Sequence, residues 1–159
     1  MRSATPFVRR MGGLGAVPLL AIGLMVAGCS SGSNHKALAS TSKSQFVARV
    51  DSICQSSNDQ LGKDAQQTFD SEQPTLDAWR RFMVETALPI VDHRLAAMRA
   101  VAAPASDVAK VNAILAAGEA AVAQAKADPS LMSPGSRAPF ERYDDLATGY
   151  GIGACAVGG

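Results

Sequence analysis

The chain has 159 residues, 47% of them hydrophobic and 5% aromatic, with a formal net charge of +1. This length fits one domain together with an export signal. Three of the 15 Lys and Arg residues lie before residue 29, and all 14 Asp and Glu residues follow it, so residues 29–159 carry a formal charge of −2. That balance excludes an electrostatic nucleic-acid binder, which needs a basic face. It also leaves no polybasic patch for adhesion to a membrane.

Residues 1–28 have the features of an export signal. Arg2, Arg9 and Arg10 form a positive start, and residues 12–28 then carry no charge. The strongest apolar stretch is 14–27, LGAVPLLAIGLMVA. A spanning helix needs about 20 apolar residues, so this stretch is short and is typical of a signal peptide.

The signal ends in Val26-Ala27-Gly28-Cys29, which resembles the lipobox of bacterial lipoproteins. A thiol can accept a diacylglyceryl group as a stable thioether, and the small residues before it give a membrane peptidase access to the peptide bond. We therefore expect Cys29 to become the lipid-modified first residue. Its diacylglyceryl and further acyl (palmitate-type) chains would anchor the protein to the outer side of the cell membrane, because two chains give stable attachment.

Two alternatives to this lipid anchor are an uncleaved anchor helix and an ordinary secretory signal. Arg9-Arg10 is only a weak twin-arginine signal, because Gly12 and Gly13 stand where apolar residues are expected. Both the general and the twin-arginine export routes therefore stay open.

Residues 29–42 are predicted to be a flexible tether. The segment begins with Ser30-Ser31-Gly32-Ser33-Asn34 and remains polar up to Ser42. Chain of this composition is flexible and buries little surface. His35 lies within it without a neighbouring partner and is interpreted as solvated.

Residues 43–155 are predicted to form a helical domain, because their apolar residues recur at steps of three and four. The capping residues are Ser42 or Ser44 for the first helix, Thr75 for the second and Ser106-Asp107 for the third. Pro89 removes a backbone donor inside the second helix, so a kink or short break is expected there. The predicted helices are 44–68, 76–103, 107–127 and 139–150. Their apolar faces include Phe46, Val50, Ile53, Cys54, Leu61 and Ala65; Leu76, Trp79, Phe82, Met83, Ile90, Leu95, Met98 and Val101; Val108, Val111, Leu115, Gly118, Val122 and Ala125; and Phe140, Tyr143, Leu146, Ala147 and Tyr150.

Short loops between these helices favour antiparallel neighbours, hence an all-α, up-down-up-down four-helix bundle. In that topology the fourth helix ends near the start of the first, and the tail after Tyr150 reaches Cys54. A disulfide between Cys54 and Cys155 is therefore expected, and it suits an oxidising location outside the cytoplasm. The alternative is two unpaired buried thiols.

The two ends of the domain carry short motifs, FVARVDSIC at 46–54 and LATGYGIGAC at 146–155. They resemble small exported proteins of actinobacteria, especially mycobacteria, which commonly have an Asp-x-Ile-Cys-like opening and a Tyr-Gly-x-x-x-Cys-like closing. The similarity covers residues 43–155. It implies a disulfide-closed helical bundle on a surface lipoprotein, usually of unknown function, and it supplies no catalytic residues.

Few residues of the domain suggest catalysis. Asp92-His93 is its only neighbouring carboxylate–imidazole pair, but adjacent helical residues do not face each other, so a surface histidine is the favoured interpretation. Asp144-Asp145 is interpreted as a solvated face, although paired acids can do acid–base work. Asp51 is expected to be structural, paired with a tail group or a cap.

No metal, cofactor or phosphate site is predicted, because the metal-ligand spacings are missing and the glycines at 149–153 follow a helix. Trp79, Phe82 and Met83, with Tyr143 or Tyr150, are interpreted mainly as core and alternatively as the wall of an apolar pocket near Pro89.

The leading hypothesis is a non-enzymatic envelope lipoprotein that binds an envelope protein or lipid or serves as an accessory module. The alternative is a carrier or sensor of an apolar small molecule held in a bundle pocket. A hydrolase using His93 is a distant third.

Overall fold

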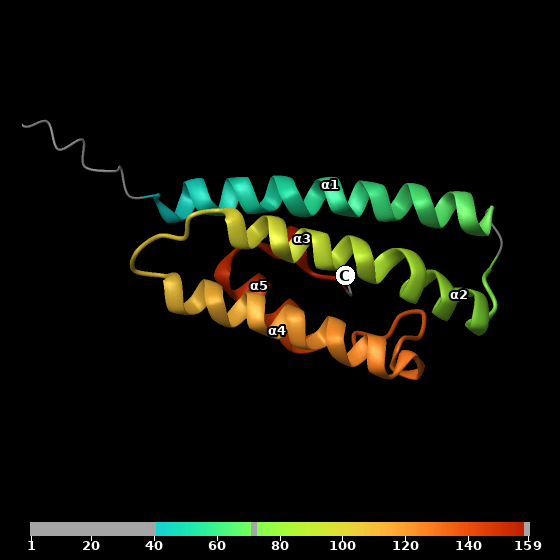
Figure 1. Ribbon diagram of the computed structural model, residues 1–159. Helices are drawn as coiled ribbons and strands as arrows, with labels where there is room; N and C mark the ends of the chain where they lie inside the picture. Colours follow the sequence, from blue (N-terminus) through green and yellow to red (C-terminus); the bar gives the residue numbers. More distant parts are fainter. Residues whose placement is uncertain (1–40, 71–72, 158–159) are drawn as a thin grey trace, which may run out of the picture. The chain divides into compact units, whose positions relative to one another are not determined.

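The computed structural model describes residues 41–70 and 73–157, and residues 36–159 form a compact unit of their own. In the described residues the fold is all-helical, without strands, and the helices pack as a bundle (Figure 1). The predicted signal peptide, Cys29 and His35 lie outside the described residues. The α-helices are α1 (Lys43–Phe69), α2 (Leu76–Phe82), α3 (Leu88–Ala100), α4 (Val108–Ala127) and α5 (Glu141–Tyr150). The shorter segments are the π-helical η1 (Met83–Ala87) and the 3-10 turns η2 (Pro129–Leu131) and η3 (Gly153–Cys155).

Helix α1 begins with a capping box, which confirms Ser42 as its cap. The Ser42 hydroxyl accepts from the Gln45 amide at 3.2 Å, and Gln45 Oε1 accepts from the Ser42 amide at 3.1 Å. This arrangement satisfies two backbone donors that the first turn leaves free. Phe46, Val50 and Cys54 then recur every fourth residue and are buried. Helix α1 packs this apolar face against α3 and η3.

The interruption expected at Pro89 takes the form of the π-helical η1, which joins α2 to α3 without a loop. In η1 the Leu88 amide donates to the Met83 carbonyl five residues earlier. Pro89 has no N–H to give to Glu85, and its ring would clash with that carbonyl in a regular α-helix. The wider π turn accommodates the proline next to it by inserting one extra residue.

This extra residue shifts the buried face, and one sequence-based assignment that follows it is therefore wrong. Ile90, expected in the core, is only partly buried, whereas Val91 is 1% exposed. A regular helix continuing from Met83, which packs against the core, would turn residue 90 inward, and one additional residue in the turn moves that position to 91. Leu76, before the shift, is 44% exposed and is also not core.

Helix α4 approaches its neighbours closely at Gly118. A Cβ atom there would lie 2.7 Å from Leu95 Cδ2 on α3 and 3.0 Å from Tyr143 Cδ2 on α5. Both distances are shorter than ordinary van der Waals contact, so the absence of a side chain at this position lets three helices meet. Val108, expected in the same seam, is 45% exposed at the start of α4.

The tail after α5 returns to α1 and closes the domain. Gly151 ends α5 with φ 105°, a left-handed conformation that favours glycine. The Ile152 amide then donates to the Ala147 carbonyl at 3.0 Å. The following turn, η3, carries Cys155 to Cys54, and the predicted disulfide is present with a Cα–Cα distance of 4.9 Å. It joins residues 101 positions apart in the sequence.

Candidate functional site

An aromatic cluster joins the end of α1 to α2. The rings of Phe69 and Trp79 stack with their centroids 6.2 Å apart, and Phe82 meets the Phe69 ring at 5.1 Å and 63°. Phe82 is buried, whereas Trp79 is only partly buried. The cluster is therefore buried at Phe82 and partly exposed at Trp79, and the ring contacts hold the indole of Trp79 in place.

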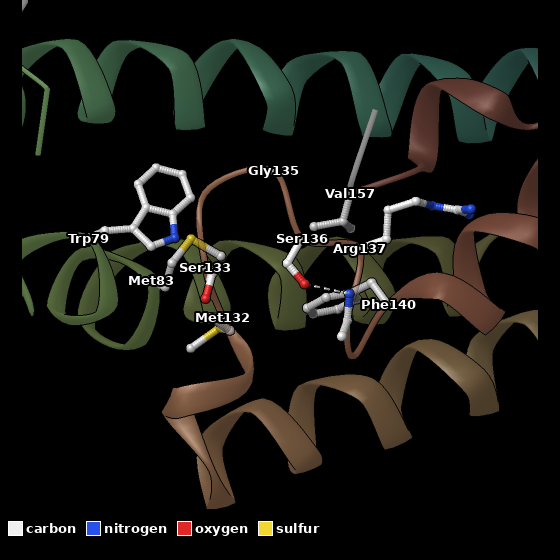
Figure 2. A pocket seen from close by; sticks show the side chains of 10 residues that line it. Trp79, Met83, Met132, Ser133, Gly135, Ser136, Arg137, Phe140 and Val157 are labelled. Atoms are coloured by element: carbon white, nitrogen blue, oxygen red, sulfur yellow. Dashed lines mark hydrogen bonds between the residues drawn. The ribbon is translucent and has the colours of Figure 1, made fainter. Parts of the chain in front are cut away.

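Two half-open cavities adjoin beside Trp79 and share the wall residues Trp79, Met83, Phe140 and Val157. We call them the polar lobe, about 220 Å³, and the apolar lobe, about 250 Å³. Each is much larger than a few water molecules, which occupy about 30 Å³ apiece in the liquid. The polar lobe (Figure 2) is completed by Met132, Ser133, Gly135, Ser136, Arg137 and Ala138. The apolar lobe is completed by Leu61, Gly62, Ala65, Phe82, Ala87, Leu88 and Val91.

The segment between α4 and α5 folds into a defined wall for the polar lobe. Asp128 Oδ1 accepts from the Ser130 amide at 3.0 Å and so starts η2. The Ser136 amide donates to the Ser133 carbonyl at 2.9 Å, and the Ala138 amide donates to Ser136 Oγ at 3.2 Å. Met132 and Phe140, at the two ends of this segment, are buried in the core. The wall is therefore part of the folded domain.

The C-terminal tail forms the remaining wall, through Val157. The Val157 amide donates to Asp144 Oδ1 at 2.7 Å, and two residues earlier the disulfide holds Cys155 to α1. The carbonyl of Ala154 also accepts from Asn58 Nδ2 at 2.9 Å. These contacts place Val157 in both lobes.

The polar groups of the cavity differ in their partners. The indole Nε1 of Trp79 is buried and has no hydrogen-bond partner among the described residues. Figure 2 shows this nitrogen on the edge of the ring that faces Met83 and Ser133. Arg137, in contrast, points away from Trp79 and donates from Nη2 to Asp145 Oδ1 at 2.7 Å. Its Nε also lies 3.9 Å from Asp144 Oδ2.

A buried polar cluster ties the tail to three helices, α1, α3 and α5. Arg94 on α3 is 0% exposed, and Asp144 on α5 is 2% exposed. Arg94 Nη2 donates to Asn58 Oδ1 at 2.6 Å, and Nη1 donates to the Cys155 carbonyl at 3.3 Å. Burial lowers the pKa of Arg94, and the nearby Tyr143 and Asp144 act to raise it.

The prediction of a solvated Asp144-Asp145 pair is wrong for Asp144. Asp145 is exposed, but Asp144 lies on the buried face of α5 with Tyr143, Ala147 and Tyr150. The arginine at 94 similarly occupies a core position of α3. A signal for this cluster was present in the sequence, namely opposite charges at core-facing positions of two helices. It was missed because helical charges are usually solvated.

The two tyrosines proposed as possible pocket walls lie elsewhere. Tyr143 is 0% exposed within the core, where its hydroxyl lies 3.8 Å from Met98 Sδ, and burial raises its pKa to about 12. The hydroxyl of Tyr150 donates to Asp107 Oδ2 at 3.0 Å. Burial and this carboxylate raise the pKa of Tyr150 to about 12. Asp107 thus binds Tyr150 and does not cap α4 with its side chain, contrary to expectation.

The other candidate residues are not brought together. Asp92 pairs with Lys126 on α4. His93 is exposed, and no side-chain hydrogen bond joins it or Asp51 to another residue in the described ranges; Asp51 Oδ1 is buried without a partner there. The tail contact expected of Asp51 is made by Asn58. His93 shares a surface pocket with Ser52, Ser56 and Ser57 of α1, but no hydrogen bond joins its imidazole to a hydroxyl or a carboxylate of the described residues.

The described part of the chain holds no group of three or more His, Cys, Asp or Glu residues suited to a metal ion. None of its helices is long and apolar enough to cross a membrane. No family model, curated protein or solved structure matches this chain.

Proposed function

We propose that the protein is a lipid-anchored lipoprotein on the outer face of the cell membrane, and that its helical domain binds a small apolar molecule beside Trp79 without catalysing a reaction. In this proposal Cys29 carries the lipid and residues 29–42 form the tether. The helical segments 43–69, 76–100, 108–127 and 141–150 run as an up-down-up-down bundle. Contacts between α1 and α3, α3 and α4, and α4 and α5 support this order.

The observation that carries the binding function is the pair of adjoining lobes beside Trp79. Ligand sites are concave and lined mainly by apolar and aromatic side chains with a few polar groups. The two lobes have this composition, and their walls come from α1, α2, η1, α3, the 132–140 segment and the tail. The walls beside Trp79 carry aromatic side chains and a buried indole N–H without a partner among the described residues, and for this reason we place the small-molecule hypothesis before the accessory module.

Replacing Gly62 by Leu is expected to block the apolar lobe without unfolding the domain. Gly62 lines this lobe, and a Cβ atom there meets no heavy atom within 4 Å. The larger side chain occupies ligand space, and leucine in a helix is favoured over glycine by roughly 0.8 kcal/mol. We expect binding of the uncharged fluorescent probe N-phenyl-1-naphthylamine to weaken by about tenfold, or roughly 1.4 kcal/mol. The urea midpoint should stay the same or rise.

Gly149→Leu is the matched control for this variant. Gly149 also lies in a helix with open space at its Cβ, but it lines neither lobe. The probe should bind Gly149→Leu as it binds the wild type. Equal binding of the probe to Gly62→Leu and Gly149→Leu would contradict a ligand site beside Trp79.

Replacing Cys29 by Ala is expected to move the protein from the membrane fraction to the soluble fraction. The variant lacks the thiol that receives the diacylglyceryl group, and the acidic remainder offers no basic patch to hold it at the surface. Mass spectrometry of the wild-type chain should show a first residue at Cys29 with added lipid mass. Membrane retention of Cys29→Ala would instead indicate an uncleaved helix.

A further inference from the structure

The two lobes divide the cavity into an end with polar groups and an end without them. The apolar lobe is walled by aliphatic and aromatic side chains such as Leu88, Val91 and Phe82. The polar lobe adds the serines at 133 and 136 and the indole N–H of Trp79. A molecule that fills both lobes therefore needs an apolar body and one polar end.

The charges around the cavity favour an uncharged polar end. Arg137 is the only charged residue among the described residues that line either lobe. Its guanidinium points away from Trp79 and is engaged by Asp145 and Asp144 (Figure 2). An anionic head in the polar lobe would find no unpaired cation, and burying an uncompensated charge is strongly unfavourable.

The donor that is buried and unpaired beside the serine hydroxyls is the indole N–H of Trp79. It is buried without a partner, and a buried unsatisfied donor costs about 1–3 kcal/mol. Met83 lies beside it in Figure 2, and a thioether side chain changes rotamer readily. An acceptor oxygen entering the polar lobe as Met83 moves would remove the cost of the unpaired donor.

The volume of the apolar lobe indicates how many carbon atoms of the apolar body it can cover. A methylene group takes about as much space as a water molecule, roughly 30 Å³. The apolar lobe, at about 250 Å³, therefore holds a chain of about eight carbon atoms.

Resting on the proposed ligand-binding function, we propose that the occupant is an uncharged single-chain acyl ester, with its alkyl chain in the apolar lobe and its ester carbonyl accepting a hydrogen bond from Trp79 Nε1. Trp79 then determines specificity by distinguishing an ester from a bare hydrocarbon. The paired state of Arg137 distinguishes an ester from a free fatty acid.

The test uses three probes of equal chain length and the single tryptophan of the chain. The chain 29–159 with Cys29→Ser, labelled with ¹⁵N and with ¹³C at the leucine and valine methyl groups, is titrated with 1-monooctanoylglycerol, octanoate and octane. This protein contains the whole compact unit 36–159. Its spectrum has one indole N–H signal, which reports the hydrogen bond directly, and the methyl signals of Leu88 and Val91 report occupancy of the apolar lobe.

We expect the monoglyceride to move the indole proton downfield and to bind several-fold more tightly than octanoate. Octane should shift the methyl signals without that downfield movement. Trp79→Phe keeps an aromatic ring but removes the donor, so it should weaken monoglyceride binding by about three- to tenfold, with a much smaller change in octane binding.

Tighter binding of octanoate, or a bound monoglyceride that leaves the indole proton in place, would overturn the ester proposal while the cavity remained a ligand site. If none of the three probes moved the Leu88 and Val91 methyl signals, the proposed ligand-binding function and the ester proposal would both be overturned.

Discussion

Replacing both Cys54 and Cys155 by Ala is expected to lower the free energy of unfolding by about 3–5 kcal/mol. The disulfide joins residues 101 positions apart and so restricts the unfolded chain. For a loop of about this length, the lost chain entropy stabilises the fold by roughly 4.7 kcal/mol. Both cysteines are fully buried, so the smaller alanines also leave unfilled space. Urea denaturation of the double variant and its parent, both with Cys29→Ser, measures the difference.

The same double variant should also weaken probe binding beside Trp79. The tail that supplies Val157 to both lobes is held two residues away by Cys155, so its release removes part of the cavity wall. Wild-type protein treated with reductant should lose probe binding as the double variant does. Gly149→Leu, which keeps both cysteines, should lose probe binding on reduction to the same extent as the wild type. A loss of stability below about 1 kcal/mol would mean that the bond hardly restrains the unfolded chain.

Replacing Arg94 by Met is expected to cost about 3–5 kcal/mol of stability, as when one partner of a buried charge pair is removed. Methionine matches much of the length of arginine but leaves Asn58 Oδ1 and the Cys155 carbonyl without their donor. It also takes a fully buried positive charge away from the neighbourhood of Asp144. Thermal and urea unfolding at pH 7 give the magnitude.

Two further variants separate charge from packing at this position. Arg94→Lys keeps the charge but cannot serve two acceptors with a planar fork, so an intermediate loss is expected. Asp144→Asn combined with Arg94→Met should cost less than the sum of the single changes, because the first removes the charge that the second leaves behind. Additive losses would show that Arg94 and Asp144 act independently.

The helices themselves were predictable because their sequence signals are local. The three- and four-residue spacing of Phe46, Val50 and Cys54 marks the buried face of α1. Thr75 accepts from the Ala78 amide at 3.2 Å and caps α2 as expected. The disulfide followed from antiparallel neighbours and a short tail, which require only element order and length.

The buried face after Pro89 was not predictable from a fixed helical period. A π turn adds one residue, so every position of α3 is rotated about the helix axis relative to the positions of α2. This is why Val91 takes the place expected for Ile90. A proline indicates that a helix is disturbed but does not specify which distortion relieves the clash.

The candidate site was predicted in part. Trp79 and Met83 were identified as possible pocket residues, and both line the cavity. The polar lobe was not foreseen, because the 132–140 segment between α4 and α5 has no periodic pattern that would place its serines and Arg137. The Arg94–Asp144 cluster likewise depends on which helices meet, and that information is not contained in either helix alone.

The most direct test of the ligand site is an isotope-filtered NOE measurement on the chain 29–159 with bound N-phenyl-1-naphthylamine. The two lobes beside Trp79 predict contacts from the aromatic protons of the probe to the methyl groups of Leu88 and Val91 and to the indole of Trp79. Contacts confined to the exposed alanines of α4, or no intermolecular contacts at saturation, would contradict binding in this cavity.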